Sequence, residues 1–104
     1  YSSVYSASKA ALHSLARTLS AEFADRGIRV NTLTIGPTET PILAGLAPEV
    51  HASVVERIAT RSPLKRMGRP EEVANAALFL ASDDSSFVIG SEIATDGGLL
   101  FNIL

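Results

Sequence analysis

The segment that decides the fold is GIRVNTLTIGP, residues 27–37. Its middle part, residues 28–35, is short, rich in β-branched side chains and bounded by glycine on both sides, which predicts a β-strand. A glycine between a helix and a strand is typical of the second half of a crossover connection. Because ligands of open α/β sheets bind at the carboxyl ends of strands, the loop that starts at Gly36 is a candidate binding loop.

Residues 1–26 precede this strand and predict one long amphipathic helix. Its apolar side chains recur at steps of three and four residues; they are Val4, Ala11, Leu12, Leu15, Leu19 and Phe23. Many small residues lie between them and would let another backbone approach closely. The helix therefore suits packing against a sheet and also against a partner helix.

Three further elements follow the strand. Residues 41–61 predict a short helix and then a longer amphipathic one. This excursion, within residues 36–67, lies between the carboxyl end of a strand and the next helix, so it either covers a bound ligand as a lid or packs as ordinary core. Residues 70–82 begin with a proline and two acids, which suit the first turn of a helix. Residues 91–96 predict the last strand, and an apolar tail follows it up to residue 104.

The order of helix, strand, helical lid, helix and strand predicts an α/β fold with two parallel strands. Two parallel strands are not stable alone, since parallel sheets are covered on both faces and usually contain several strands. We therefore expect the 104 residues to form about half of a domain.

Composition and charge exclude several classes of function. The chain is 46% hydrophobic and 19% charged, as expected for a globular domain, and its net charge of -2 does not suit a nucleic-acid binder. No cysteine is present, and His13 and His51 stand apart from other ligand-type residues, so we expect no metal site. No apolar run reaches the length of a membrane span. We expect a cytoplasmic protein with a small-molecule partner.

The start of the long helix contains a candidate catalytic pair. Tyr5 and Lys9 are four residues apart and would lie on one helix face, so both head groups can reach one small volume. At roughly 4–5 Å and an effective dielectric of ~20, the charge of Lys9 favours the phenolate form of Tyr5 by about 3–4 kcal/mol. The tyrosine could then exchange a proton near neutrality. The spacing alone is weak evidence, because chance would produce it in on the order of one protein in ten.

Five motifs in the same order as in a known family give this pair its meaning. They are Tyr5-xxx-Lys9, Ile28-Arg29-Val30-Asn31, Gly36-Pro37-Thr38-Glu39-Thr40, Gly68-Arg69-Pro70-Glu71-Glu72 and Asp96-Gly97-Gly98. With these motifs the chain resembles the C-terminal half of a short-chain dehydrogenase/reductase from residue 1 to about residue 99. The resemblance implies the C-terminal part of a Rossmann-like, doubly wound parallel sheet, incomplete as given.

The resemblance also implies hydride transfer between NAD or NADP and an alcohol or carbonyl substrate. Tyr5 would be the general acid–base, and Lys9 would both assist Tyr5 and bind the nicotinamide ribose. The cofactor-binding residues would be Lys9, Gly36, Pro37, Thr38 and Thr40, whereas Asn31 would be a structural polar residue. The family usually has proline before the glycine of this loop; here Ile35 occupies that place and Pro37 follows Gly36.

The same resemblance implies that parts of such an enzyme lie outside these 104 residues. The glycine-rich phosphate loop, the residue that selects NAD or NADP, and the catalytic serine would all belong upstream of Tyr1. Two hypotheses follow. The chain is part of an active oxidoreductase that assembles as a homo-oligomer, a dimer or tetramer, or it is a non-catalytic fragment that folds by self-association.

Overall fold

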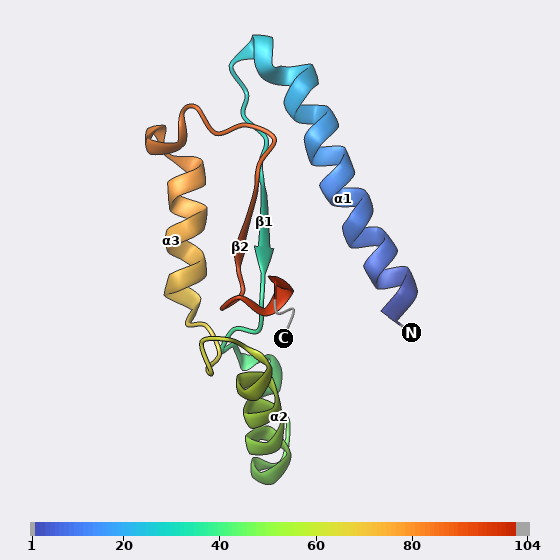
Figure 1. The fold of residues 1–104 in the computed structure, drawn as a ribbon, viewed down its shortest axis with the longest axis vertical. Coiled ribbons are helices and arrows are strands. Elements are labelled where there is room, and N and C mark those ends of the chain that lie inside the picture. Colours follow the sequence, from blue (N-terminus) through green and yellow to red (C-terminus); the bar gives the residue numbers. More distant parts are fainter. Residues whose placement is uncertain (1, 102–104) are drawn as a thin grey trace. The chain divides into compact units, whose positions relative to one another are not determined.

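The computed structural model describes residues 2–101, whose elements follow the predicted order (Figure 1). The helices are α1 (Ser2–Phe23), α2 (Pro48–Arg61) and α3 (Pro70–Ala81), and the strands are β1 (Thr32–Ile35) and β2 (Glu92–Thr95). Short 3-10 turns lie at Ala24–Arg26, Pro41–Leu43, Asp83–Ser85 and Leu99–Phe101. The parts of the predictions that concern Tyr1 and residues 102–104 lie outside the described residues.

The two strands are hydrogen-bonded neighbours in a two-stranded sheet (Figure 1). The Thr32 N–H donates to the Ser91 carbonyl at 2.9 Å, and the Gly36 N–H donates to the Thr95 carbonyl at 3.0 Å. This constant register along both strands is that of a parallel pair, which confirms the predicted α/β arrangement. Because parallel sheets are normally covered on both faces, the described residues form only part of such a fold.

The strand predicted over residues 28–35 begins four residues later, at Thr32. The side chain of Asn31 explains the difference: its Nδ2 donates to the Val88 carbonyl at 2.9 Å, and its Oδ1 accepts the Ser91 N–H at 3.0 Å. The Asn31 carboxamide thus bonds backbone groups that would otherwise be available for pairing between the strands. Regular strand pairing therefore starts one residue later, at Thr32. These bonds confirm a structural role for Asn31. The last strand is also shorter than the predicted residues 91–96.

The chain divides into two compact units, of which the first contains the residues up to Leu33 together with Leu78–Ile93. In this unit the second half of α1 contacts the segment that leads into β2. Ser20 is buried, and a Cβ atom on Gly90 would lie only 2.8 Å from its hydroxyl. Earlier in the helix, His13 Nδ1 lies 3.1 Å from a carboxylate oxygen of Glu92. These two contacts attach α1 to the start of the strand.

Arg29 joins the segment before β1 to the C-terminal end of α3. Its guanidinium donates to the carbonyls of Leu80 and Ser82 at 3.0 and 3.1 Å and to the Ser85 hydroxyl at 2.8 Å. The last carbonyls of a helix have no partner within the helix, and a cation there also complements the helix dipole. The arginine of the Ile28–Asn31 motif therefore has a structural role within this unit.

The second unit contains Thr34–Ala77 and the residues from Ala94 onward. Its connection between α2 and α3 packs against the turn that follows β2. The Gly97 carbonyl accepts a hydrogen bond from the Ser62 hydroxyl at 3.1 Å and one from the Leu64 N–H at 3.3 Å. Ser62 and Met67 are both buried. This packing brings residues 62–68 to the carboxyl end of the strand.

Large apolar side chains remain exposed in both units. Phe87 and Val4 in the first unit are 100% and 79% exposed, and Ile42 in the second is 85% exposed. Such surface is unusual for a complete globular domain, so it fits the expectation of an incomplete one. Within residues 2–101, no helix has both the length and the apolar character needed to cross a membrane.

Candidate active site

Tyr5 and Lys9 lie on successive turns of α1, as the spacing predicts. The Lys9 Nζ atom is 5.4 Å from the centre of the Tyr5 ring, and the tyrosine is 64% exposed. Ser8 lies between these two residues in the sequence, and its hydroxyl donates to the Tyr5 backbone carbonyl at 2.7 Å. This hydroxyl is therefore engaged in a bond to the helix backbone. The two candidate head groups are therefore adjacent and accessible from solvent.

The loop after β1 begins with a close contact between two backbones. Gly36 follows the strand, and the space beside it is filled by Asp96, which follows β2. A Cβ atom on Gly36 would lie 2.5 Å from the Asp96 Cα and 2.6 Å from its Cβ. Only glycine permits this approach, because separations under 3 Å are far inside ordinary van der Waals contact. The carboxyl ends of the two strands can therefore meet directly.

We predict that Gly36→Ala destabilises the protein by about 1–3 kcal/mol, because the new methyl group must displace the Asp96 backbone rather than a flexible side chain. Urea unfolding would measure the effect. Gly45→Ala is the matched control, since a Cβ atom at Gly45 meets nothing within 4 Å. Equal stability of the Gly36→Ala and Gly45→Ala variants would contradict the steric account.

The other predicted cofactor-binding residues of this loop follow Gly36 directly in the sequence. The Thr38 hydroxyl donates to the Gly36 carbonyl at 3.0 Å and stiffens the loop from within. The Pro37 carbonyl accepts the Gly68 N–H at 3.0 Å, and the Glu39 N–H donates to the Gly68 carbonyl at 2.9 Å. Thr40 is exposed and extended, directly before the Pro41–Leu43 turn. The residues of this loop thus lie together in the second unit, whereas Tyr5 and Lys9 belong to the first.

A cavity of about 500 Å³ lies beside this loop, within the second unit. Pro37 lines it from the carboxyl end of β1, and residues 94–98 line it from the carboxyl end of β2. The remaining walls come from Ile58 of α2, from α3 and from the connection between these helices. This is the edge of the sheet at which open α/β proteins bind ligands.

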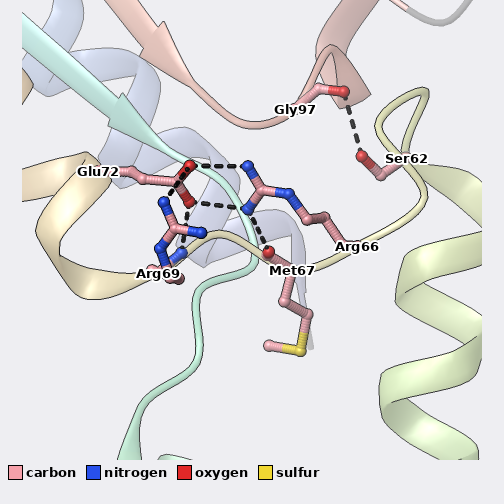
Figure 2. Close-up of polar contacts among 6 residues, drawn as sticks. All are labelled: Ser62, Arg66, Met67, Arg69, Glu72 and Gly97. Atoms are coloured by element: carbon pink, nitrogen blue, oxygen red, sulfur yellow. Dashed lines mark hydrogen bonds and ion pairs between the residues drawn. The ribbon is translucent and has the colours of Figure 1, made fainter.

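Three charged residues at the start of α3 form a hydrogen-bonded cluster, Arg66–Glu72–Arg69 (Figure 2). Arg66 donates to both carboxylate oxygens of Glu72, at 2.7 and 2.8 Å. The same carboxylate accepts the Arg69 backbone N–H at 2.7 Å, as the third residue of a helix often does for its N-cap. The Arg66 side chain also donates to the Met67 carbonyl at 3.0 Å. The cluster therefore fixes the residues on both sides of Gly68.

These bonds change the acidity of the partners. They lower the pKa of Glu72 from 4.5 to about 2, through the side-chain hydrogen bonds from Arg66 first and the backbone bond from Arg69 next. The same pairing raises the pKa of Arg66. Both shifts favour the charged forms, so the ion pair is stable throughout the neutral range.

The stability of the protein should depend on Glu72 at acidic pH. In the unfolded chain this carboxylate gains a proton near pH 4.5, but in the folded protein only near pH 2. Since the folded-state pKa is the lower one, the stabilisation is complete above about pH 5 and is lost as the pH falls toward 2. We expect the difference in urea midpoint between wild type and Glu72→Gln to shrink over this interval. Glu71→Gln is the matched control, and a difference independent of pH would contradict the prediction.

Sequence reasoning missed the cluster and the role of Asp96. The two acids after Pro70 indicated only the first turn of a helix, although a glutamate at the third helical position was a usable signal for an N-terminal cap. The Asp96 carboxylate accepts the backbone N–H groups of Gly98 and Leu100, at 2.9 and 2.8 Å. The Asp96-Gly97-Gly98 motif is thus a turn that ends β2, and both glycines have positive φ angles.

The fold and the position of the cavity define an α/β protein with a candidate ligand site at the carboxyl ends of parallel strands. Residues 1–100 match the family model described as enoyl-(acyl carrier protein) reductase. The chain therefore belongs to this family of short-chain dehydrogenases/reductases. Its similarity to known members extends over more than nine tenths of the chain in each comparison below.

Two curated relatives illustrate the similarity. The chain is 48% identical over 97 residues to cis-4-hydroxycyclohexanecarboxylate dehydrogenase of Sinomonas cyclohexanicum, which covers 93% of the chain and 37% of that protein. It is 46% identical over 96 residues to the 3-oxoacyl-(acyl-carrier-protein) reductase of Thermotoga maritima, with 92% and 37% covered. By name, one relative is a dehydrogenase and the other a reductase, so both are oxidoreductases.

Solved structures show the same fold. A short chain dehydrogenase from Bacillus anthracis matches with a TM-score of 0.75 and 32% identity, over 94% of this chain and 35% of that one. A 3-oxoacyl-(acyl-carrier protein) reductase from Brucella melitensis matches with a TM-score of 0.79 and 42% identity, over 91% and 34%. The chain thus spans little more than a third of the length of the proteins that it matches.

Proposed function

We propose that the chain supplies the proton-transfer part of an NAD- or NADP-dependent short-chain dehydrogenase/reductase. The observation that carries the proposal is the pairing of Tyr5 and Lys9 on one face of α1, with the Lys9 Nζ atom 5.4 Å from the Tyr5 ring. In the direction of reduction, Tyr5 donates a proton to the substrate oxygen as hydride reaches the carbonyl carbon, so that no free alkoxide develops. Family membership supports this role.

The cofactor chemistry fits the residues of the second unit. Gly36 allows the loop after β1 to pass close to Asp96, and the loop borders a cavity at the carboxyl ends of the strands. Residues Gly36, Pro37, Thr38 and Thr40 would line the nicotinamide, and Lys9 would bind its ribose. The bound nicotinamide supplies or accepts the hydride. The phosphate loop and the catalytic serine would come from a region of the complete protein that corresponds to the part of the relatives not matched by these 104 residues.

An assay of the complete protein tests this function. We expect oxidation of NADH or NADPH, followed by its absorbance, in the presence of carbonyl compounds, and the reverse reaction with alcohols. The names of the relatives suggest a first panel of cyclic ketones and 3-oxoacyl thioesters. The isolated 104 residues are expected to be inactive, because most of the binding energy for the dinucleotide comes from its phosphates. Failure of the complete protein to oxidise either cofactor with any member of the panel would refute the proposal.

The exposed face of α1 favours a second candidate, in which the 104 residues form a non-catalytic self-associating unit. Val4, Leu12 and Leu15 are 79%, 53% and 50% exposed on this helix. Burying such a stripe against a second copy would remove apolar surface from water, and a homo-oligomer of the complete enzyme would use the same face. Size-exclusion chromatography with light scattering tests this alternative; a folded monomer would refute it.

A further inference from the structure

The loop that would bind the nicotinamide is held in place by a residue distant in sequence. Thr38 and Gly68 form an isolated parallel β-bridge, in which Gly68 bonds the Pro37 carbonyl and the Glu39 N–H. These two groups lie on either side of Thr38. A bridge of this geometry uses the neighbours of the bridged residue and leaves the N–H and carbonyl of Thr38 itself outside it. The backbone groups of Thr38 are thus directed away from Gly68.

The Arg66–Glu72–Arg69 cluster fixes the position of Gly68. On one side of the glycine, Arg66 binds the Met67 carbonyl; on the other, Glu72 accepts the Arg69 N–H. The Glu72 Oε2 atom would also lie 3.9 Å from a Cβ atom built on Gly68, so the carboxylate is directly adjacent. Glu72 belongs to the first turn of α3. The cluster therefore anchors the bridge between Thr38 and Gly68 to a helix rather than to a free loop.

Capping of α3 alone does not account for the cluster. A cap requires only the bond from the Arg69 N–H to Glu72. The bidentate pair between Arg66 and Glu72, with bonds of 2.7 and 2.8 Å, is additional. Such a fork-to-carboxylate pair has one preferred geometry, which adds directional precision to the contact.

We propose that Arg66 and Glu72 are positioning residues for the cofactor: by holding Gly68 they set the direction of the Thr38 backbone groups toward the nicotinamide. This inference rests on the proposed function, which gives the loop its ligand. Both residues act through Gly68 and Thr38 and not by touching the cofactor. Loss of either should therefore weaken recognition of the nicotinamide end of the dinucleotide and leave recognition of its other end unchanged.

The test uses the complete enzyme with Glu72→Gln, which keeps the shape of the side chain but removes its charge. NADH or NADPH and ADP-ribose, or its 2′-phosphate for an NADP enzyme, are titrated by fluorescence and calorimetry. We expect the dinucleotide to bind about tenfold more weakly, because one or two well-oriented hydrogen bonds to it are lost. The affinity for ADP-ribose, which has no nicotinamide, should change by less than about twofold. Arg66→Lys should act in the same direction, since lysine keeps the charge but not the fork.

Glu71→Gln is the control, because it removes a carboxylate from the same helical turn and should leave both titrations unchanged. Equal weakening of dinucleotide and ADP-ribose by Glu72→Gln would indicate a general structural defect and overturn the inference, as would no change in either. If Glu72→Gln does not fold, Arg66→Lys is judged by the same criteria. The proposed function fails separately, if the wild-type enzyme binds no nicotinamide dinucleotide or if Tyr5→Phe retains full activity.

Discussion

Replacing Tyr5 by phenylalanine in the complete enzyme should lower kcat by about 100- to 10,000-fold, the usual contribution of a positioned general acid. The variant loses only the hydroxyl group that would give its proton to the substrate oxygen. Tyr5 is 64% exposed in the described structure, so the substitution leaves no unsatisfied buried group in α1. Cofactor affinity should stay nearly unchanged. The loss would therefore be a loss of kcat and of kcat/KM together, the signature of an interaction made in the transition state.

Tyr1→Phe is the matched control for this experiment, since it removes the chain's other tyrosine hydroxyl. The residue four positions after Tyr1 is Tyr5, so Tyr1 has no lysine at the spacing of the catalytic pair. We expect its kcat to remain within about threefold of wild type, because this variant keeps both the Tyr5 hydroxyl and the Lys9 charge. An unchanged kcat in Tyr5→Phe would remove Tyr5 from the role of proton donor.

Lys9→Ala should damage both binding and turnover. Lys9 would donate hydrogen bonds to the ribose of the nicotinamide, and a charge-assisted bond of this kind contributes about 1.5–3 kcal/mol, so the cofactor KM should rise about tenfold or more. Removal of the positive charge 5.4 Å from the Tyr5 ring should in addition lower kcat, because negative charge that develops on the Tyr5 oxygen as it gives up its proton would lose a neighbouring positive charge. Steady-state kinetics at several cofactor concentrations separate the two effects.

Arg17→Ala is the matched control for the lysine, because it removes an exposed positive charge from the same helix, two turns further along. A variant of Lys9 that changed neither the cofactor KM nor kcat would exclude this residue from the site. An increase in KM without a change in kcat would leave Lys9 as a binding residue only.

The elements were predictable because their signals are local. Glycines and prolines mark the ends of the predicted helices and strands, and the periodicity of α1 is visible without any tertiary contact. The order of elements also determined the parallel pairing, since a strand that returns after a helical crossover runs in the same direction. The start of β1 was wrong by four residues because the Asn31 side chain, which bonds Val88 and Ser91, replaces the ladder there. Such a contact between residues 57 and 60 positions apart has no local signal.

The candidate site was predictable to a smaller extent. The helical spacing of Tyr5 and Lys9 and the family motifs identified the pair and the loop after β1. The close approach of Gly36 to Asp96 and the bridge from Thr38 to Gly68 depend on tertiary packing between segments more than 25 residues apart, so no periodicity could indicate them. No periodicity could indicate the pairing of Arg66 with Glu72 either, because the two residues approach each other only through the turn that precedes α3.

Transfer of deuterium from a nicotinamide cofactor reduced with deuteride tests the central claim most directly. The complete wild-type enzyme and its Tyr5→Phe variant would be incubated with the labelled cofactor and a carbonyl substrate, and the alcohol analysed by mass spectrometry. The account predicts deuterium on the carbinol carbon of the wild-type product and less than about one hundredth of that rate of transfer in the variant. Unlabelled product from the wild type, or equal rates in both proteins, would contradict it.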